Sequence, residues 1–139
     1  MEPIEINGKK FKCFNSLILH LSKQRPIAYN TELSELAESA IAGLFLSQLL
    51  YWLGKGHKEG YIYKTVKDFQ KETCLIRSEQ DRAIKIWRGL EVLDVKLKGI
   101  PPKRHFKVNT NKLLRLLGYC EGDIARINDL ICRYWQIEK

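Results

Sequence analysis

The chain has 139 residues, a net charge of +8, 45% hydrophobic residues and 10% aromatic residues. This length buries a core without help from disulfides or metals, and it fits one domain with a modest appendage. No apolar run reaches the length of a membrane span, and the start of the chain lacks the basic-then-apolar layout of a signal peptide. We therefore expect a cytoplasmic protein with no membrane partner.

The cysteines and the catalytic signatures exclude further classes. Four cysteines stand at positions 13, 74, 120 and 132, without a C-x-x-C pair and without a histidine at ligand spacing. We expect reduced, mostly buried thiols, no metal and no cofactor. No G-x-S-x-G, H-E-x-x-H or paired-carboxylate signature occurs, so we do not expect an enzyme.

The positive charge is concentrated in one part of the chain. Residues 61–115 hold fourteen Lys or Arg and six Asp or Glu, whereas the flanking segments are close to neutral. From Lys96 to Arg115 there are seven basic residues and no acid. A field concentrated on one segment predicts a polyanionic partner.

The first part of the chain predicts an N-terminal extension over residues 1–25. An Asn7-Gly8 pair stands between short flanks within residues 4–14, and this pair is typical of a tight hairpin turn. Residues 16–21 are apolar and short, and their pattern does not decide between a helical turn and a strand. Arg25-Pro26 then breaks the pattern.

A buried helix is predicted next. Asn30 or Thr31 can cap a short helix running to about residue 39. Residues 40–53 are apolar almost all round, which indicates a central helix, and the small residues Gly43 and Ser47 would allow a neighbour to approach closely. The glycine-containing loop 54–60 lacks the order of a phosphate-binding loop, and residues 61–63 read as a short strand.

Two helix-start signals follow in tandem. They are Thr65-x-x-Asp68 and Ser78-x-x-Asp81, joined by a tight connection at 74–77, and they predict helices over 66–73 and about 79–92. Two helices so close suggest a helix-turn-helix. At 100° per residue, the second helix turns one set inward and another outward. The inward set is Ala83, Ile86, Trp87 and Leu90, and the outward set is Arg82, Lys85 and Arg88.

A two-stranded ribbon is predicted after these helices. Residues 93–98 alternate between apolar and polar, 99–102 form a turn, and a second alternating segment ends near Val108. The residues expected to face inward are Val95, Leu97, Phe106 and Val108, and those expected outward are Lys96, Lys98, His105 and Lys107. The order helix, turn, helix, ribbon predicts an α+β chain, mainly α, with a winged helix-turn-helix over 26–117.

The C-terminal segment 118–139 predicts one more helix. Asn109 or Thr110 caps a helix through Leu117, and Gly118 can end it. Asp123 can cap a last helix to about residue 135, whose apolar stripe over 124–135 is the candidate homodimer interface.

Several segments together carry a resemblance to a known family. They are Leu44-Phe45-Leu46-Ser47-Gln48-Leu49-Leu50-Tyr51-Trp52, Tyr63-Lys64-Thr65, Arg82-Ala83-Ile84 and Gly99-Ile100-Pro101-Pro102-Lys103-Arg104-His105-Phe106. Over about residues 26–117 the chain resembles the winged-helix module of phage and mobile-element replication-type proteins, such as replisome organisers and plasmid initiators. The resemblance implies double-stranded DNA binding with a reading helix that carries Gln80, Arg82 and Lys85. Such proteins often carry a further domain that engages a helicase or loader, and the short segment after residue 117 favours a stand-alone DNA binder.

The expected function is sequence-specific binding of double-stranded DNA, by a transcriptional regulator or a replication-origin binder. The alternative is a winged-helix protein-interaction module that modulates a host or viral complex. RNA binding is a weaker alternative, because exposed aromatic residues are not evident on the ribbon. Glu79 and Asp81 would repel phosphate, and we expect them to act in capping and in ion pairs with Arg82 or Lys85. The candidate DNA contacts are Lys64, Arg77, Ser78, Gln80, Arg82, Lys85, Arg88, Lys96, Lys98, Lys103, Arg104, His105 and Lys107.

Overall fold

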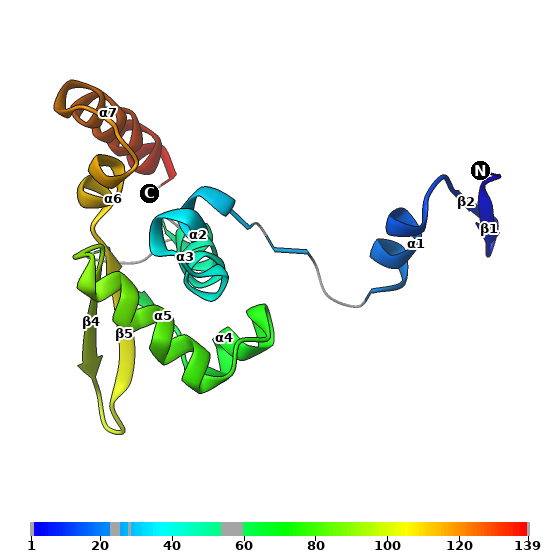
Figure 1. The fold of residues 1–139 in the computed structure, drawn as a ribbon, viewed down its shortest axis with the longest axis horizontal. Coiled ribbons are helices and arrows are strands. Elements are labelled where there is room, and N and C mark those ends of the chain that lie inside the picture. Colours follow the sequence, from blue (N-terminus) through cyan, green and yellow to red (C-terminus); the bar gives the residue numbers. More distant parts are fainter. Residues whose placement is uncertain (1, 23–25, 28, 54–59, 139) are drawn as a thin grey trace.

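The computed structural model describes residues 2–22, 26–27, 29–53 and 60–138, with side chains described as far as residue 130. Within these ranges the chain is an α+β protein with a two-stranded hairpin, a three-stranded antiparallel sheet and seven helices (Figure 1). The elements are β1 (Ile4–Ile6), β2 (Lys9–Phe11), α1 (Phe14–Leu21), α2 (Thr31–Ala37), α3 (Ala40–Trp52), β3 (Ile62–Tyr63), α4 (Val66–Thr73), α5 (Arg77–Gly89), β4 (Leu93–Lys98), β5 (Lys103–Val108), α6 (Thr110–Leu116) and α7 (Glu121–Glu138).

The N-terminal hairpin forms around the predicted turn. Asn7 and Gly8 have φ values of 52° and 80°, the left-handed conformation that a two-residue hairpin turn requires. The undecided stretch after it is helical, because α1 buries Leu17 while the His20 ring lies 5.0 Å from that of Phe11. In Figure 1 these elements lie apart from the rest of the fold.

Helices α2 and α3 pack closely, as the small residues predicted. The Asn30 side chain caps α2 by accepting the Glu32 N–H at 2.9 Å. A Cβ atom built on Gly43 would lie 2.7 Å from the Cα of Ser34, so glycine is required at this crossing. Ser47 is buried and bonded, since its hydroxyl donates to the Gly43 carbonyl at 2.7 Å and accepts the Asn30 N–H.

The start of α4 agrees with the prediction and the start of α5 does not. Thr65 Oγ1 accepts the Asp68 N–H at 3.0 Å, and the Asp68 carboxylate accepts the Thr65 N–H at 3.2 Å. Helix α5 instead begins at Arg77, two residues before the predicted start. Glu79 caps this start, as its carboxylate accepts the Ile76 N–H at 3.1 Å from the third position of the helix, the position that Asp81 would hold in a helix capped by Ser78.

The core lies between the helices and one face of the sheet, whose strand order is β3-β5-β4. Phe106 on β5 is fully buried, and its ring meets those of Phe45 and Phe69 edge-on at 5.7 and 5.8 Å. Trp87 of α5 is also fully buried, and its indole N–H donates to the Ala42 carbonyl at 2.7 Å. The face of the sheet that includes Phe106 is therefore its inner face.

The ribbon β4–β5 extends past this core. Val108 and Phe106 are buried as predicted, but Leu97 is 68% exposed, which corrects the expectation that it faces a core. Leu97 does lie on the inner side of the strand, but there it lines an open groove that separates the ribbon from α5. No helix therefore covers Leu97.

Helices α6 and α7 follow the ribbon, and both were predicted. Asn109 Oδ1 accepts the Lys112 N–H at 3.1 Å and caps α6. Helix α7 begins at Glu121, so Asp123 lies in its first turn and is not its cap. Ile124 is buried and Leu130 is 48% exposed. The rest of the predicted dimer stripe, 131–135, falls on side chains outside the described part, and the dimer interface stays a prediction.

The described cysteines correct the expectation of mostly buried thiols. Cys13, Cys74 and Cys120 are exposed and unpaired with one another. Each stands at or beside a helix end, where the chain turns at the surface, and Cys74 adopts a φ of 65° as the C-cap of α4. The thiol of Cys132 lies outside the described side chains.

Candidate nucleic-acid interface

The predicted contact residues separate onto two faces of the molecule. Successive side chains of a strand point to opposite sides of a sheet, so the register of β3, β5 and β4 fixes which residues share a face. Arg104 and Leu97 share the inner side with Phe106, whereas the ribbon lysines and His105 lie on the outer side. The ribbon therefore does not present all of its basic residues beside α5.

The first face is the exposed side of α5. Arg82, Lys85 and Arg88 are exposed, as predicted, and Arg77 and Ser78 are exposed at the start of the helix. An open groove of about 670 Å³ separates α5 from the inner side of the ribbon. Asp81, Lys85 and Arg88 line it from the helix, and Val95, Leu97 and Arg104 line it from the ribbon.

Gln80 is not on that exposed side, which corrects its assignment as a contact residue. Its side chain is fully buried, and its amide nitrogen donates to the carbonyls of Val66 and Leu75 at 3.0 and 2.8 Å. Its amide oxygen accepts from Arg104 at 3.0 Å. Gln80 therefore ties α4, the α4–α5 turn and the ribbon together, and it is unavailable to a ligand in this arrangement.

Arg104 is also bonded within the fold, whereas it was predicted to be an exposed phosphate contact on the ribbon. Its guanidinium donates to the Asp81 carboxylate at 3.0 Å, and the side chain is only 17% exposed. Burial lowers the pKa of Arg104, and the nearby Asp81 charge opposes that shift. The expected ion pair of Asp81 thus forms with Arg104, with Arg77 at 4.0 Å, and not with Arg82 or Lys85.

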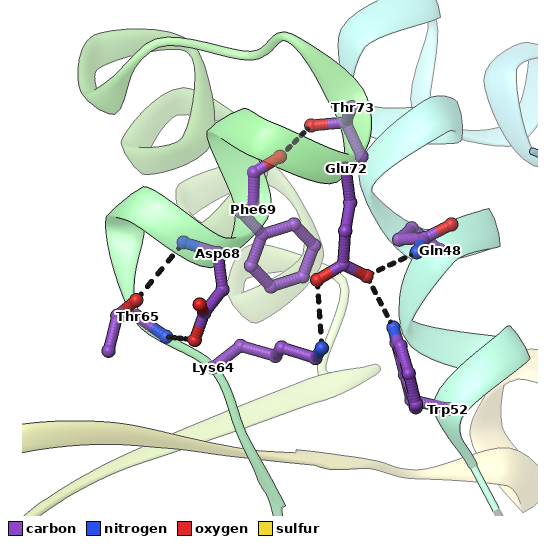
Figure 2. Close-up of polar contacts among 8 residues, drawn as sticks. All are labelled: Gln48, Trp52, Lys64, Thr65, Asp68, Phe69, Glu72 and Thr73. Carbon is purple, nitrogen blue, oxygen red and sulfur yellow. Dashed lines mark hydrogen bonds and ion pairs between the residues drawn. The ribbon is translucent and has the colours of Figure 1, made fainter. Parts of the chain in front are cut away.

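Lys64 belongs to a polar cluster between α3 and α4, which Figure 2 shows. One oxygen of the Glu72 carboxylate accepts from the Gln48 amide and from the Trp52 indole N–H at 2.6 Å. The other oxygen pairs with the Lys64 ammonium group at 2.8 Å, and that group also lies 3.7 Å from the centre of the Trp52 ring. Lys64 is 14% exposed, so its charge is already matched inside the fold.

The second face is the outer face of the sheet, which we define by Tyr61, Tyr63, Lys96, Lys98, Lys103, His105 and Lys107. The ammonium groups of Lys96, Lys98 and Lys107 lie 4.9, 4.8 and 5.6 Å from the centre of the Tyr61 ring. Lys103 lies 5.5 Å from that of Tyr63. This surface combines aromatic rings with clustered positive charge.

The two tyrosines are functional candidates that the sequence reading passed over. Segment 61–63 was expected to be a strand, and alternation within it was the signal that both tyrosines flank the buried Ile62 on one side. Their strand pairs with β5, not β4, so the pattern within the ribbon alone did not reveal them. His105 joins them, with its ring 5.1 Å from that of Tyr63 and its Nδ1 3.0 Å from the Lys103 carbonyl oxygen.

Comparison with known proteins adds no relative: no family model, curated protein or solved structure matches this chain. Among the described residues, no three His, Cys, Asp or Glu side chains are grouped so as to hold a metal ion. Within the same ranges, no helix is long and apolar enough to cross a membrane. The functional argument therefore depends on the two faces themselves.

Proposed function

We propose that this protein binds double-stranded DNA in a sequence-specific manner through a winged helix-turn-helix. The support is the order α3, β3, α4, α5, β4, β5, together with a sheet in which β3 pairs with β5 and β5 with β4. In this arrangement α4 and α5 form the helix-turn-helix and the ribbon is the wing. Helix α5 is the element that enters the major groove.

The observation that carries the proposal is the exposed basic side of α5 beside an open groove. Arg82, Lys85 and Arg88 are exposed there, and Asp81, the acid that lines the groove beside Lys85 and Arg88, pairs with Arg104. An arginine in the first half of a reading helix suits the guanine edge, which accepts two hydrogen bonds in the major groove. Arg82 therefore reads a base, while Lys85 and Arg88 contact the edges of the groove.

The wing supplies phosphate contacts at its tip. Lys98 and Lys103 are opposite each other in the register, next to the turn, and both are exposed. With Arg77, Lys85 and Arg88 they make about five neutralised phosphates, which predicts a slope near −4 to −5 for log K against log salt. Occupancy of a promoter or of a replication origin would be the biological outcome.

The test is fluorescence anisotropy with a labelled duplex across a salt series, first on random DNA and then on a selected site. Replacing Arg82 by Ala should cost about 1–3 kcal/mol on the selected site and relax preference at one base pair. The matched control is Arg126→Ala on α7, an exposed arginine that pairs with Asp123 at 3.7 Å, which should leave binding unchanged. An absence of duplex binding at low salt, or an unchanged sequence preference in Arg82→Ala, contradicts the proposal.

A further inference from the structure

The outer face of the sheet holds more than the phosphate contacts of a wing require. Tyr61, Tyr63 and His105 are each half-buried, so part of every ring remains accessible to a ligand. The rings of Tyr63 and His105 are 5.1 Å apart and inclined by 35°. A row of aromatic rings on a sheet provides surfaces onto which flat groups can stack.

The lysines around these rings are close to one another. Three ammonium groups surround the single ring of Tyr61, at 4.8 to 5.6 Å from its centre. Asp94 is the one acid that the register places on this side of the ribbon, and its carboxylate accepts the Tyr61 hydroxyl at 3.3 Å. Like charges gathered this densely repel one another, and a bound polyanion relieves that repulsion.

We propose that the outer face of the sheet binds unpaired nucleic acid, with bases stacked on Tyr61 and Tyr63 and with phosphates held by the surrounding lysines. A duplex does not use these rings, because paired bases keep their flat faces inside the stack and offer only their edges. A stacked base is worth more than an exposed ammonium group over the same ring. When bases stack on the tyrosine rings, the lysine ammonium groups can therefore leave these rings and pair with phosphates.

This site is distinct from the exposed side of α5. The two tyrosines lie on the opposite side of the sheet from Phe106 and from the groove beside α5. Substitutions at Tyr61 and Tyr63 therefore test the outer face, and substitution at Arg82 tests the duplex site. The inference goes beyond the proposed duplex binding and fails or succeeds separately from it.

The first experiment measures anisotropy of labelled oligo(dT) and oligo(U) with the full chain, its Tyr61→Leu/Tyr63→Leu variant and the matched Tyr61→Phe/Tyr63→Phe variant. The Leu variant should lose about tenfold or more in affinity for single strands, since stacking on two rings is removed. The Phe variant keeps the rings and should remain within about twofold of the parent. Arg126→Ala, which removes an exposed arginine of α7 far from the sheet in the sequence, should leave single-strand affinity unchanged. Thermal unfolding of each variant checks that it is folded.

The second experiment needs no substitution at all. Oligonucleotides carrying 5-iodouracil are cross-linked to the parent chain by ultraviolet light, and the modified peptides are mapped by mass spectrometry. Cross-links at Tyr61 or Tyr63 are expected. Cross-links elsewhere only, no binding of either oligonucleotide at low salt, or an equal loss in the Phe and Leu variants would overturn the proposal.

Discussion

Lys64 and the lysines of the outer face of the sheet carry the same charge in opposite settings. Lys64 is 14% exposed, pairs with Glu72 at 2.8 Å and covers the Trp52 ring. On the outer face, Lys98, Lys103 and Lys107 are exposed, and Asp94 is the one acid that the register places on their side of the ribbon. The difference separates charge that holds the fold together from charge that is available to an external anion. Counting basic residues in the sequence does not make that distinction.

Removing Glu72 should produce the largest effect. The variant Glu72→Ala leaves the Trp52 indole N–H, the Gln48 amide and the Lys64 ammonium group without their shared acceptor. The expected loss is about 2 kcal/mol in the free energy of unfolding, measured by urea denaturation. Glu121→Ala is the control, because its pair with Arg115 is exposed and screened by water, so that its removal should cost much less than that of Glu72. Equal losses in the two variants would show that the Glu72 cluster has no special structural role.

A smaller effect is expected at the cap of α4, close to the Glu72 cluster. The variant Thr65→Ala removes the hydroxyl that accepts the Asp68 N–H, and it should cost about 1 kcal/mol in the free energy of unfolding. Ser78→Ala, at the helix start that the structure does not use, should cost less than about 0.5 kcal/mol. A larger loss for Ser78→Ala would contradict the observed start of α5.

The same cap predicts a dependence of stability on pH. The Thr65 backbone N–H holds the pKa of Asp68 below its ordinary value. A lowered pKa in the folded state stabilises the protein at neutral pH, and that contribution is lost as the pH falls below the ordinary value and through the lowered one. Unfolding measured across this acidic range should therefore depend less on pH in Asp68→Asn than in the parent. An identical dependence in both would show that the cap does not contribute.

The smallest effect on stability is expected on the outer face of the sheet. The double variant Lys98→Gln/Lys107→Gln should change the free energy of unfolding by less than about 0.5 kcal/mol, because both side chains are exposed. Its affinity for single-stranded nucleic acid should nevertheless fall, with a salt slope reduced by about 1.4 for the two phosphate contacts removed. A large loss of stability with unchanged binding would show that these two lysines, like Lys64, stabilise the fold and do not bind an external anion.

Much of the fold followed from local patterns. The hairpin turn at Asn7-Gly8, the buried helix around Gly43 and the cap at Thr65 each depend on a few neighbouring residues, and the structure has all three. The start of α5 was misplaced because Glu79 and Asp81 can each serve as the third-position acid of a helix start, and the sequence does not rank them. Local signals thus predicted correctly which elements form, but they did not predict the residue at which α5 begins.

The candidate site was harder to predict, because its assignments depend on contacts between distant segments. Gln80 was assigned to the DNA contacts from its place at the start of the expected reading helix, but it bonds to Arg104, which is 24 residues away. Leu97 fits an alternating strand and is still exposed, since an open groove separates this part of the ribbon from α5. The tyrosines were missed because the strand that pairs with β5 precedes the ribbon by some thirty residues.

The two hydrogen bonds of Arg104 have a mechanical consequence. Because the Arg104 guanidinium donates to both Gln80 and Asp81, it holds the ribbon in a fixed position against the first half of α5. Under the proposed function, α5 and the ribbon therefore contact DNA at a fixed distance from each other. Little conformational entropy is lost on binding, because this arrangement is already formed. DNA binding would then depend on the distance between the base contacted by α5 and the phosphate contacted by the ribbon. Duplexes whose local geometry changes that distance would bind more weakly.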